Sequence, residues 1–149
     1  MSEIFLDTNV LVSCIDTTRR LHREAFALID RVQGGELKAF ISTQVVGEFY
    51  VSLTKSHGGL KAPLSAEEAG EELEALLGSG LFTLLPVTPG VVSRAVTLSV
   101  QKGIRGIRFW DVVSVATMLE GGLSTLCTEN FRDFKGFSDV VRVLGPEDL

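Results

Sequence analysis

The sequence has few cysteines, no long apolar run and no excess of positive charge. Its two cysteines, Cys14 and Cys127, lie within apolar segments, which favours buried free thiols over a disulfide or a metal site. The N-terminal segment lacks a basic region followed by a long apolar core, and no apolar run approaches the roughly 20 residues of a membrane span. We therefore expect a cytoplasmic protein without a membrane partner. The net charge of −5 excludes a protein that holds nucleic acid by overall positive charge, so any such contact must be local.

Composition indicates an ordered, globular chain. Of its 149 residues, 45% are hydrophobic and 22% are charged, which is far from the composition of disordered chains. A chain of this length suits one domain, which we expect to span residues 1–149. Acidic residues outnumber basic ones by 19 to 14, and their positions carry the functional information.

Short apolar segments alternate with amphipathic helical segments, which is the pattern of an α/β domain with a mainly parallel sheet. Strands are predicted at residues 4–6, 37–41, 81–87 and 123–127, with 140–144 as a candidate fifth strand. Helices are predicted at residues 21–32, 43–55, 65–77, 88–102 and 111–120. Ser65, followed three residues later by Glu68, forms a capping-box signature at the start of the third helix.

Asp7 directly follows the first predicted strand, at the sheet edge where open α/β folds bind their ligands. This placement fits a functional carboxylate, and it equally fits an Asp that caps a following helix. Thr8 and Asn9 could orient the carboxylate, although both are also common turn residues. The late strand ends in a similar group of polar residues: Thr128, Glu129, Asn130 and, close behind, Asp133.

Two further carboxylates lie on predicted helices. Asp111 falls within the apolar stripe of its helix, between Val115 and Met118, so we expect it to face inward. A buried carboxylate needs a cation or hydrogen-bond donors, and the structural alternative is a cap at the helix N-terminus. Glu48 lies on the border of its helix's apolar stripe, beside Ser52, where it faces either a cleft or solvent.

Three or four carboxylates from distant parts of the chain are thus predicted to converge on one sheet edge. Like charges at that spacing cannot all remain ionised without a counter-cation. Oxygen ligands alone favour Mg²⁺ or Mn²⁺ over zinc. A carboxylate-held Mg²⁺ that keeps open water sites is the usual equipment for phosphodiester hydrolysis.

Four segments together resemble the PIN-domain family: IFLDTNVLV, STQVVGEFYVSL, IRFWDVVSVATML and LCTENF. The resemblance spans nearly the whole chain. It implies a three-layer α/β/α fold and a ribonuclease dependent on Mg²⁺ or Mn²⁺, often the toxin of a VapBC-type toxin-antitoxin pair. It also implies RNA as substrate, a cognate antitoxin as partner and a homodimer. The family's acidic site corresponds here to Asp7, Glu48 and Asp111.

The chain departs from the family pattern at Asn130, where the fourth carboxylate usually stands. An amide can bind a metal as a neutral oxygen ligand, but it supplies no charge and cannot act as a base. A second ion is therefore in question. Glu129 or Asp133 could take the missing role, or the site could work with one ion.

Two basic clusters flank the predicted site, with a solvated charged face as the alternative to phosphate binding. The first comprises Arg19, Arg20, His22 and Arg23, and the second comprises Lys102, Arg105 and Arg108. Phe109 and Trp110 could stack on an unpaired base, or they could simply belong to the core.

Three other functions compete with a toxin ribonuclease. A haloacid-dehalogenase-like phosphatase also begins with a strand and an Asp, but it needs a second Asp two residues later, where this chain has Asn9. A degenerate PIN domain would bind nucleic acid or protein without cleavage, as Asn130 suggests. A housekeeping RNA-processing nuclease would share the chemistry but lack an antitoxin.

Overall fold

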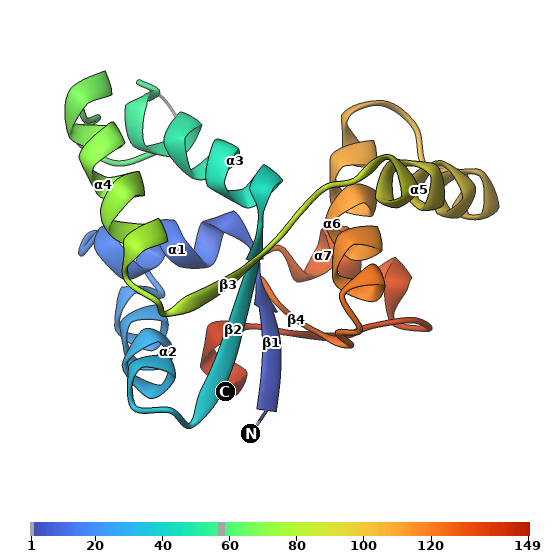
Figure 1. Ribbon diagram of the computed structural model, residues 1–149, viewed down its shortest axis with the longest axis horizontal. Coiled ribbons are helices and arrows are strands. Elements are labelled where there is room, and N and C mark those ends of the chain that lie inside the picture. The colour runs from blue at the N-terminus through green and yellow to red at the C-terminus, as the bar shows by residue number, and fades with distance from the viewer. Residues whose placement is uncertain (1, 57–58) are drawn as a thin grey trace.

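The computed structural model describes residues 2–56 and 59–149 and contains one five-stranded sheet, in which every strand pair is parallel (Figure 1). The strands are β1 (Ser2–Leu6), β2 (Leu37–Ser42), β3 (Phe82–Leu85), β4 (Thr125–Cys127) and β5 (Arg142–Leu144). The α-helices are α1 (Thr8–Ile15), α2 (His22–Gln33), α3 (Thr43–Thr54), α4 (Ala66–Gly78), α5 (Pro89–Lys102), α6 (Phe109–Glu120) and α7 (Phe131–Phe134).

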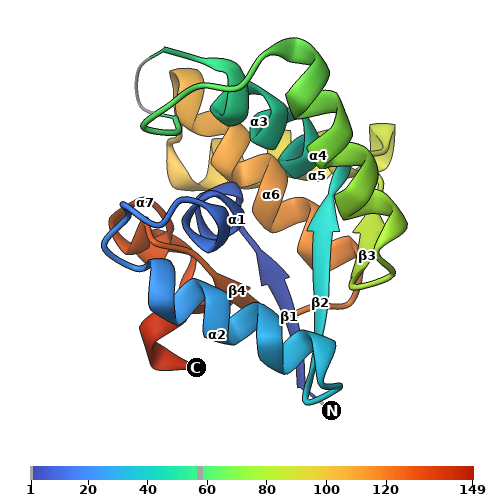
Figure 2. The same ribbon diagram turned by 90° about the vertical axis from the view of Figure 1, so that its left-hand side faces the viewer.

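Helices cover both sides of the sheet, which gives the three-layer α/β/α fold that the sequence predicts. In Figure 1, α1, α2 and α4 lie on one side of the strands, and α5, α6 and α7 lie on the other. Figure 2 shows α2 in front of the strands, which all run in one direction. The middle of α6, from Val112 to Met118, is buried on all sides, so this helix anchors its layer to the sheet.

The strand order β3-β2-β1-β4-β5 places the switch in chain direction at β1. The chain proceeds outward from β1 to β2 and β3, and then returns to place β4 on the other side of β1. Open α/β sheets bind ligands in the crevice at the carboxyl ends of strands around such a switch point. Leu6 pairs with Cys127, so the residues that follow β1 and β4 are direct neighbours in this crevice.

Most predicted elements are confirmed, with ends shifted by a few residues. The capping box of Ser65 and Glu68 is present, and both cysteines are free thiols. The strand predicted at 81–87 is shorter, and the helix predicted from residue 111 begins at Phe109. Within the described residues, no helix is long and apolar enough to cross a membrane.

Helices α1 and α7 have no counterpart among the predicted elements. The α1 segment, TNVLVSCI, is apolar and rich in β-branched residues, which disfavour helices in isolation. Its helix forms because Asp7 caps its start and because its residues from Val10 to Val12 are buried in the core. Tertiary packing therefore overrides local preference in this segment.

Candidate active site

Asp7 lies at the centre of the polar groups that follow β1 and β4. Its Oδ1 accepts a hydrogen bond from the Thr8 backbone N–H at 2.8 Å, so it caps α1. Its Oδ2 accepts from the Thr128 hydroxyl at 2.7 Å and from the Asn9 amide at 3.4 Å. Both interpretations of Asp7 from the sequence therefore describe the same side chain: one oxygen caps the helix, and the other lies among the groups of the crevice.

Asn9 and Thr128 connect the ends of β1 and β4. The Asn9 side chain donates to the Thr128 hydroxyl at 3.3 Å and accepts from the Glu129 backbone N–H at 3.1 Å. The Thr128 oxygen also accepts from the Asn130 backbone N–H at 3.0 Å. These bonds fix the backbone at Glu129 and Asn130. Asn9 and Thr128 therefore orient the site rather than merely form turns.

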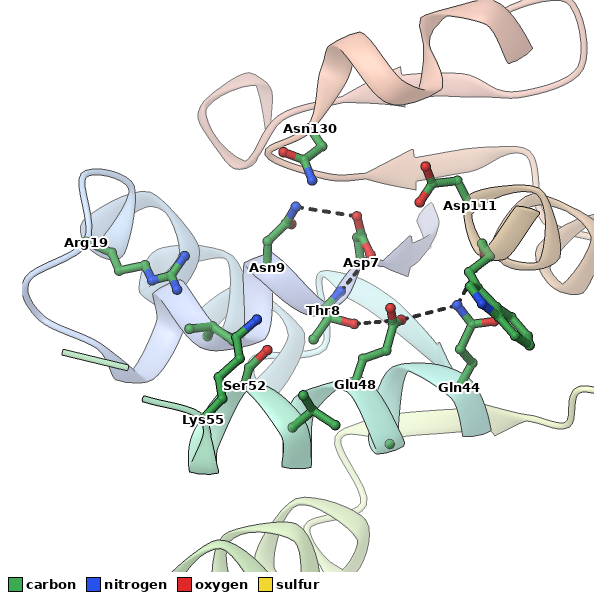
Figure 3. A pocket seen from close by; sticks show the side chains of 14 residues that line it. Asp7, Thr8, Asn9, Arg19, Gln44, Glu48, Ser52, Lys55, Asp111 and Asn130 are labelled. Carbon is green, nitrogen blue, oxygen red and sulfur yellow. Dashed lines mark hydrogen bonds between the residues drawn. The ribbon is translucent and has the colours of Figure 1, made fainter. Parts of the chain in front are cut away.

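Glu48 extends from α3 toward Asp7 and is held by two donors. Its Oε1 accepts from the Thr8 hydroxyl at 3.2 Å and from the Gln44 amide at 3.3 Å (Figure 3). Gln44 also donates to the Trp110 carbonyl at 3.1 Å, which links α3 to the start of α6. The sequence left two alternatives for Glu48, a cleft or solvent, and the structure shows that it faces the cleft.

Asp111 lies in the first turn of α6 and is half-buried. It is not the helix cap, because Arg108 occupies the N-cap position without a side-chain capping bond. Among the described residues, its carboxylate accepts no hydrogen bond. Figure 3 shows it directed from α6 toward Asp7 across the crevice.

A cavity of about 650 Å³ brings these groups together. It lies within the size range of pockets that enclose small ligands. Its lining includes three carboxylates and one amide of the predicted site: Asp7, Glu48, Asp111 and Asn130. Thr8 and Asn9 also line it.

The pKa values of the three carboxylates are all raised. Burial raises the pKa of Asp7 above its usual value, although hydrogen bonds from Thr128 and Thr8 offset part of the effect. Burial also raises the pKa of Glu48, and the charge of Asp7 adds to the shift. Burial, together with the charges of Asp133 and Asp7, raises the pKa of Asp111 to about 6. Each shift means that burial and the neighbouring acids outweigh what stabilises the charged form, including the charge of Arg108 near Asp111.

The donor set fits a hard divalent cation, because it consists of carboxylate and amide oxygens around a water-accessible cavity. Such an ion would supply the missing positive charge and lower all three pKa values. Within the described residues, however, no group of three acidic, histidine or cysteine side chains is already arranged to hold a metal ion. The structure shows the three carboxylates and the Asn130 amide around one cavity.

Unlike Asn130, the two acidic residues Glu129 and Asp133 do not line the cavity. The Glu129 carboxylate accepts a hydrogen bond from the Ser13 hydroxyl of α1, and the residue does not line the cavity. Asp133 is half-buried outside the lining, close enough for its charge to raise the pKa of Asp7 and Asp111. Thr128 is buried beneath the site.

Only one residue of the two predicted basic clusters lines the cavity. Of the residues proposed for RNA binding, Arg19 lines it, whereas Arg20, Arg23, Arg105 and Arg108 do not. Arg108 donates to the Asp133 carbonyl at 3.0 Å, and Lys102 pairs with Asp139 at 3.0 Å on the surface. These contacts favour a structural role for Lys102.

A family model of the PIN domain matches residues 4–140, a range that includes β2, β3, β4 and all four residues of the predicted site. The chain belongs to the PIN domain family. No curated protein matches its sequence.

Solved structures of VapC20, FitAcB and VapBC share this fold. VapC20 of Mycobacterium tuberculosis, a sarcin-ricin loop cleaving toxin, is 19% identical with a TM-score of 0.67, covering 89% of this chain and 94% of that chain. FitAcB from Neisseria gonorrhoeae is 22% identical with a TM-score of 0.63, covering 98% of this chain and 99% of that one. DNA-bound VapBC from Salmonella typhimurium is 19% identical with a TM-score of 0.67, with the same coverage as FitAcB. At such identities the likeness shows the fold alone.

Among the polar residues that line this PIN-domain cavity, sequence reasoning missed Gln44 and Lys55. Both lie on or next to α3, at four residues before and seven residues after Glu48. That spacing places all three on one face of the helix, which was a usable signal. Trp110, which the sequence left as either core or base-stacking residue, lines the cavity and is 52% exposed, whereas Phe109 packs against the core.

Proposed function

We propose that this PIN-domain protein is an endoribonuclease that depends on Mg²⁺ or Mn²⁺ and acts as the toxin of a toxin-antitoxin pair. One observation carries the proposal. Three carboxylates with raised pKa values surround one cavity at the switch point of the sheet, where a cation and a phosphodiester would meet.

In this proposal Asp7, Glu48 and Asp111 hold the ion, and Asn130 offers a neutral amide oxygen. When bound, the ion activates a water molecule and neutralises the charge that develops on the phosphate. Thr8, Asn9 and Thr128 keep Asp7 oriented through their hydrogen bonds.

Glu129 would reach the ion only by leaving Ser13, so we assign it first to fixing the end of β4 against α1. Asp133 adds negative charge near the ion without lining the cavity.

RNA fits the groups around the carboxylates. The exposed ring of Trp110 can stack on an unpaired base, which a duplex does not offer. Arg19 lies in the cavity, and we place Arg20, Arg23, Arg105 and Arg108 at outer phosphate contacts. The net charge of −5 makes such local contacts necessary.

The test is cleavage of single-stranded RNA by the purified protein. We expect fragments in Mg²⁺ or Mn²⁺, none after chelation, and recovery when the ion is restored. Asp111→Asn should be inactive, whereas Glu74→Gln, a matched change of an exposed carboxylate on α4, should cut like the wild type. Cleavage that persists in excess chelator, or in Asp111→Asn, would contradict the proposal.

A second candidate is a PIN domain that binds nucleic acid without cutting it, and Asn130 is the observation that favours it. In that case the wild type would bind single-stranded RNA but leave it intact in both metals. Asn130→Asp would then be the direct test of whether the missing carboxylate is the cause.

The partner in this proposal is an antitoxin, and the surface offers it an apolar groove. A cavity of about 140 Å³ between α1, α2, α4 and β3 is lined almost entirely by apolar side chains, among them Leu11, Ile15, Ile29 and Leu76. One apolar side chain from the amphipathic helix of a partner could fill this cavity. A protein without any such partner would instead be a housekeeping nuclease.

We also propose a homodimer, as the resemblance implies. Val92, Val96 and Val100 follow one another at intervals of four residues along α5, and all three are exposed. They form an apolar stripe on which a second copy could pack.

A further inference from the structure

The cavity continues past the carboxylates to an end of opposite charge. Figure 3 shows Arg19, Ser52 and Lys55 grouped away from Asp111, with Glu48 between the two ends. Arg19 and Lys55 are the basic residues of the cavity lining. We call Arg19, Ser52 and Lys55 the basic wall.

The helix α3 sets the separation between the acidic end and the basic wall. Glu48, Ser52 and Lys55 follow at intervals of four and three residues, so they share one face of α3 and its end. A rise of about 1.5 Å per residue puts Lys55 roughly 10 Å beyond Glu48 along the axis. One extended ligand can therefore touch both ends at once.

Arg19 is held in place by two loops. Its Nη2 donates to the Gly59 carbonyl at 3.0 Å, and its Nε lies 3.9 Å from the Asp16 carboxylate. Gly59 lies close to the end of α3, since a Cβ there would clash with the Ser52 carbonyl oxygen. These contacts do not involve Nη1 of Arg19.

Asp16 is the anchor of this arrangement. It is 9% exposed, and its carboxylate accepts hydrogen bonds from the Thr18 hydroxyl at 2.6 Å, from the Thr18 backbone N–H at 3.0 Å and from the Lys61 backbone N–H at 3.3 Å. It therefore ties the loop after α1 to the loop after α3, from which Arg19 and Gly59 approach each other. A guanidinium fixed in this way loses little conformational entropy when it binds a second anion.

We propose that the basic wall binds the phosphate next to the scissile phosphodiester in single-stranded RNA. The inference rests on the proposed function and adds a second phosphate site to it. Three carboxylates at one end of the cavity repel a polyanion. At the other end Lys55, together with Arg19, whose charge Asp16 partly balances, reduces that repulsion where the RNA chain must enter. Arg19 supplies directed N–H donors, Lys55 supplies a point charge, and the Ser52 hydroxyl is a third donor.

The test compares two substrates that differ in the neighbouring phosphate. An oligoribonucleotide carries it, whereas a dinucleoside monophosphate has only the scissile one. In Arg19→Gln/Lys55→Gln we expect kcat/KM on the oligoribonucleotide to fall by at least tenfold, with cleavage of the dinucleoside monophosphate unchanged. Lys38→Gln, a matched loss of charge on β2 away from the cavity, should leave both unchanged. Equal losses on both substrates, or no loss on either, would overturn the proposal.

A binding measurement separates this proposal from the proposed function. Affinity for a fluorescent single-stranded RNA, measured against salt in the Asp111→Asn background, does not require cleavage. The double variant should bind more weakly, with a slope of log K against log salt that is smaller by about 0.7 per lost phosphate contact. Lys55→Gln alone, at an exposed helix end, should show part of the effect without any risk to folding. An unchanged affinity and slope, or a defect confined to binding of a protein partner, would overturn the basic wall even if the enzyme cuts RNA.

Discussion

Asp111 is a half-buried carboxylate whose charged form the fold disfavours. Its pKa of about 6 means that the native protein holds its proton more tightly than the unfolded chain, in which the value is near 3.8. The carboxyl is protonated in both states at low pH and then costs nothing. As pH rises from the unfolded value through about 6, the native state must be ionised against burial and its acidic neighbours, so stability is lost.

Replacing Asp111 by Asn should therefore stabilise the metal-free protein while it abolishes cleavage. Because the side chain is only half-buried, we expect a gain of about 1 kcal/mol, or a rise in Tm of about 2–4 °C, at pH 7. The gain should vanish near pH 4. Thermal unfolding in chelator at both pH values checks it, and a lower Tm at pH 7 would show that the carboxylate is stabilising instead.

In the proposed site, Asn130 stands where the resemblance to the family places a fourth carboxylate. Asn130→Asp should lower the Mg²⁺ or Mn²⁺ concentration needed for half-maximal cleavage, because a charged ligand replaces a neutral one at the cavity. Metal titrations of the cleavage rate measure this. Superimposable curves for the two proteins would place Asn130 outside the ion's ligands.

At the scale of elements, the site depends on the connection between the ends of β1 and β4. Thr128 is buried, donates to Asp7 and accepts from Asn9 and from the Asn130 N–H. Thr128→Val keeps the shape but leaves these groups without their partner. We expect a loss of about 1–3 kcal/mol in the free energy of unfolding, measured in urea, together with slower cleavage. A variant as stable as the wild type would show that water replaces the hydroxyl.

The elements that the sequence predicts are those with clear periodicity or end signals. Thr88 before Pro89 marked the start of α5, and the alternation of segments indicated the parallel sheet. The helix α1 could not be predicted locally, since its β-branched residues favour extended structure and only burial against the core makes it helical.

As with the secondary-structure elements, only part of the candidate site could be predicted from the sequence. Asp111 followed from helix periodicity, whereas Asp7 equally fitted a helix cap and Glu48 equally fitted a solvent-exposed position until the resemblance was added. The bond between Glu129 and Ser13 joins residues 116 positions apart, and no local pattern reveals it. Lys55 was overlooked because a basic residue at a helix end is ordinarily a solvated cap of the dipole.

At the scale of the whole molecule, a toxin must have an inhibitor. Expression of the protein alone should slow bacterial growth, and co-expression of a neighbouring short gene should relieve the effect through a complex that survives purification. Light scattering would give the stoichiometry of that complex and of the free protein, for which we expect a dimer. Harmless overexpression of folded, active protein without a copurifying partner would favour a housekeeping nuclease.

Calorimetric titration with Mn²⁺ shows whether Asp7, Glu48 and Asp111 share one divalent ion, as we propose. We predict that Asp7→Asn, Glu48→Gln and Asp111→Asn each weaken binding by at least tenfold, whereas Glu74→Gln binds like the wild type. Wild-type affinity should also fall below about pH 6, because protons compete for Asp111. Wild-type affinity in any one of the three variants, at pH 7 and with an intact fold, would contradict the claim for that residue.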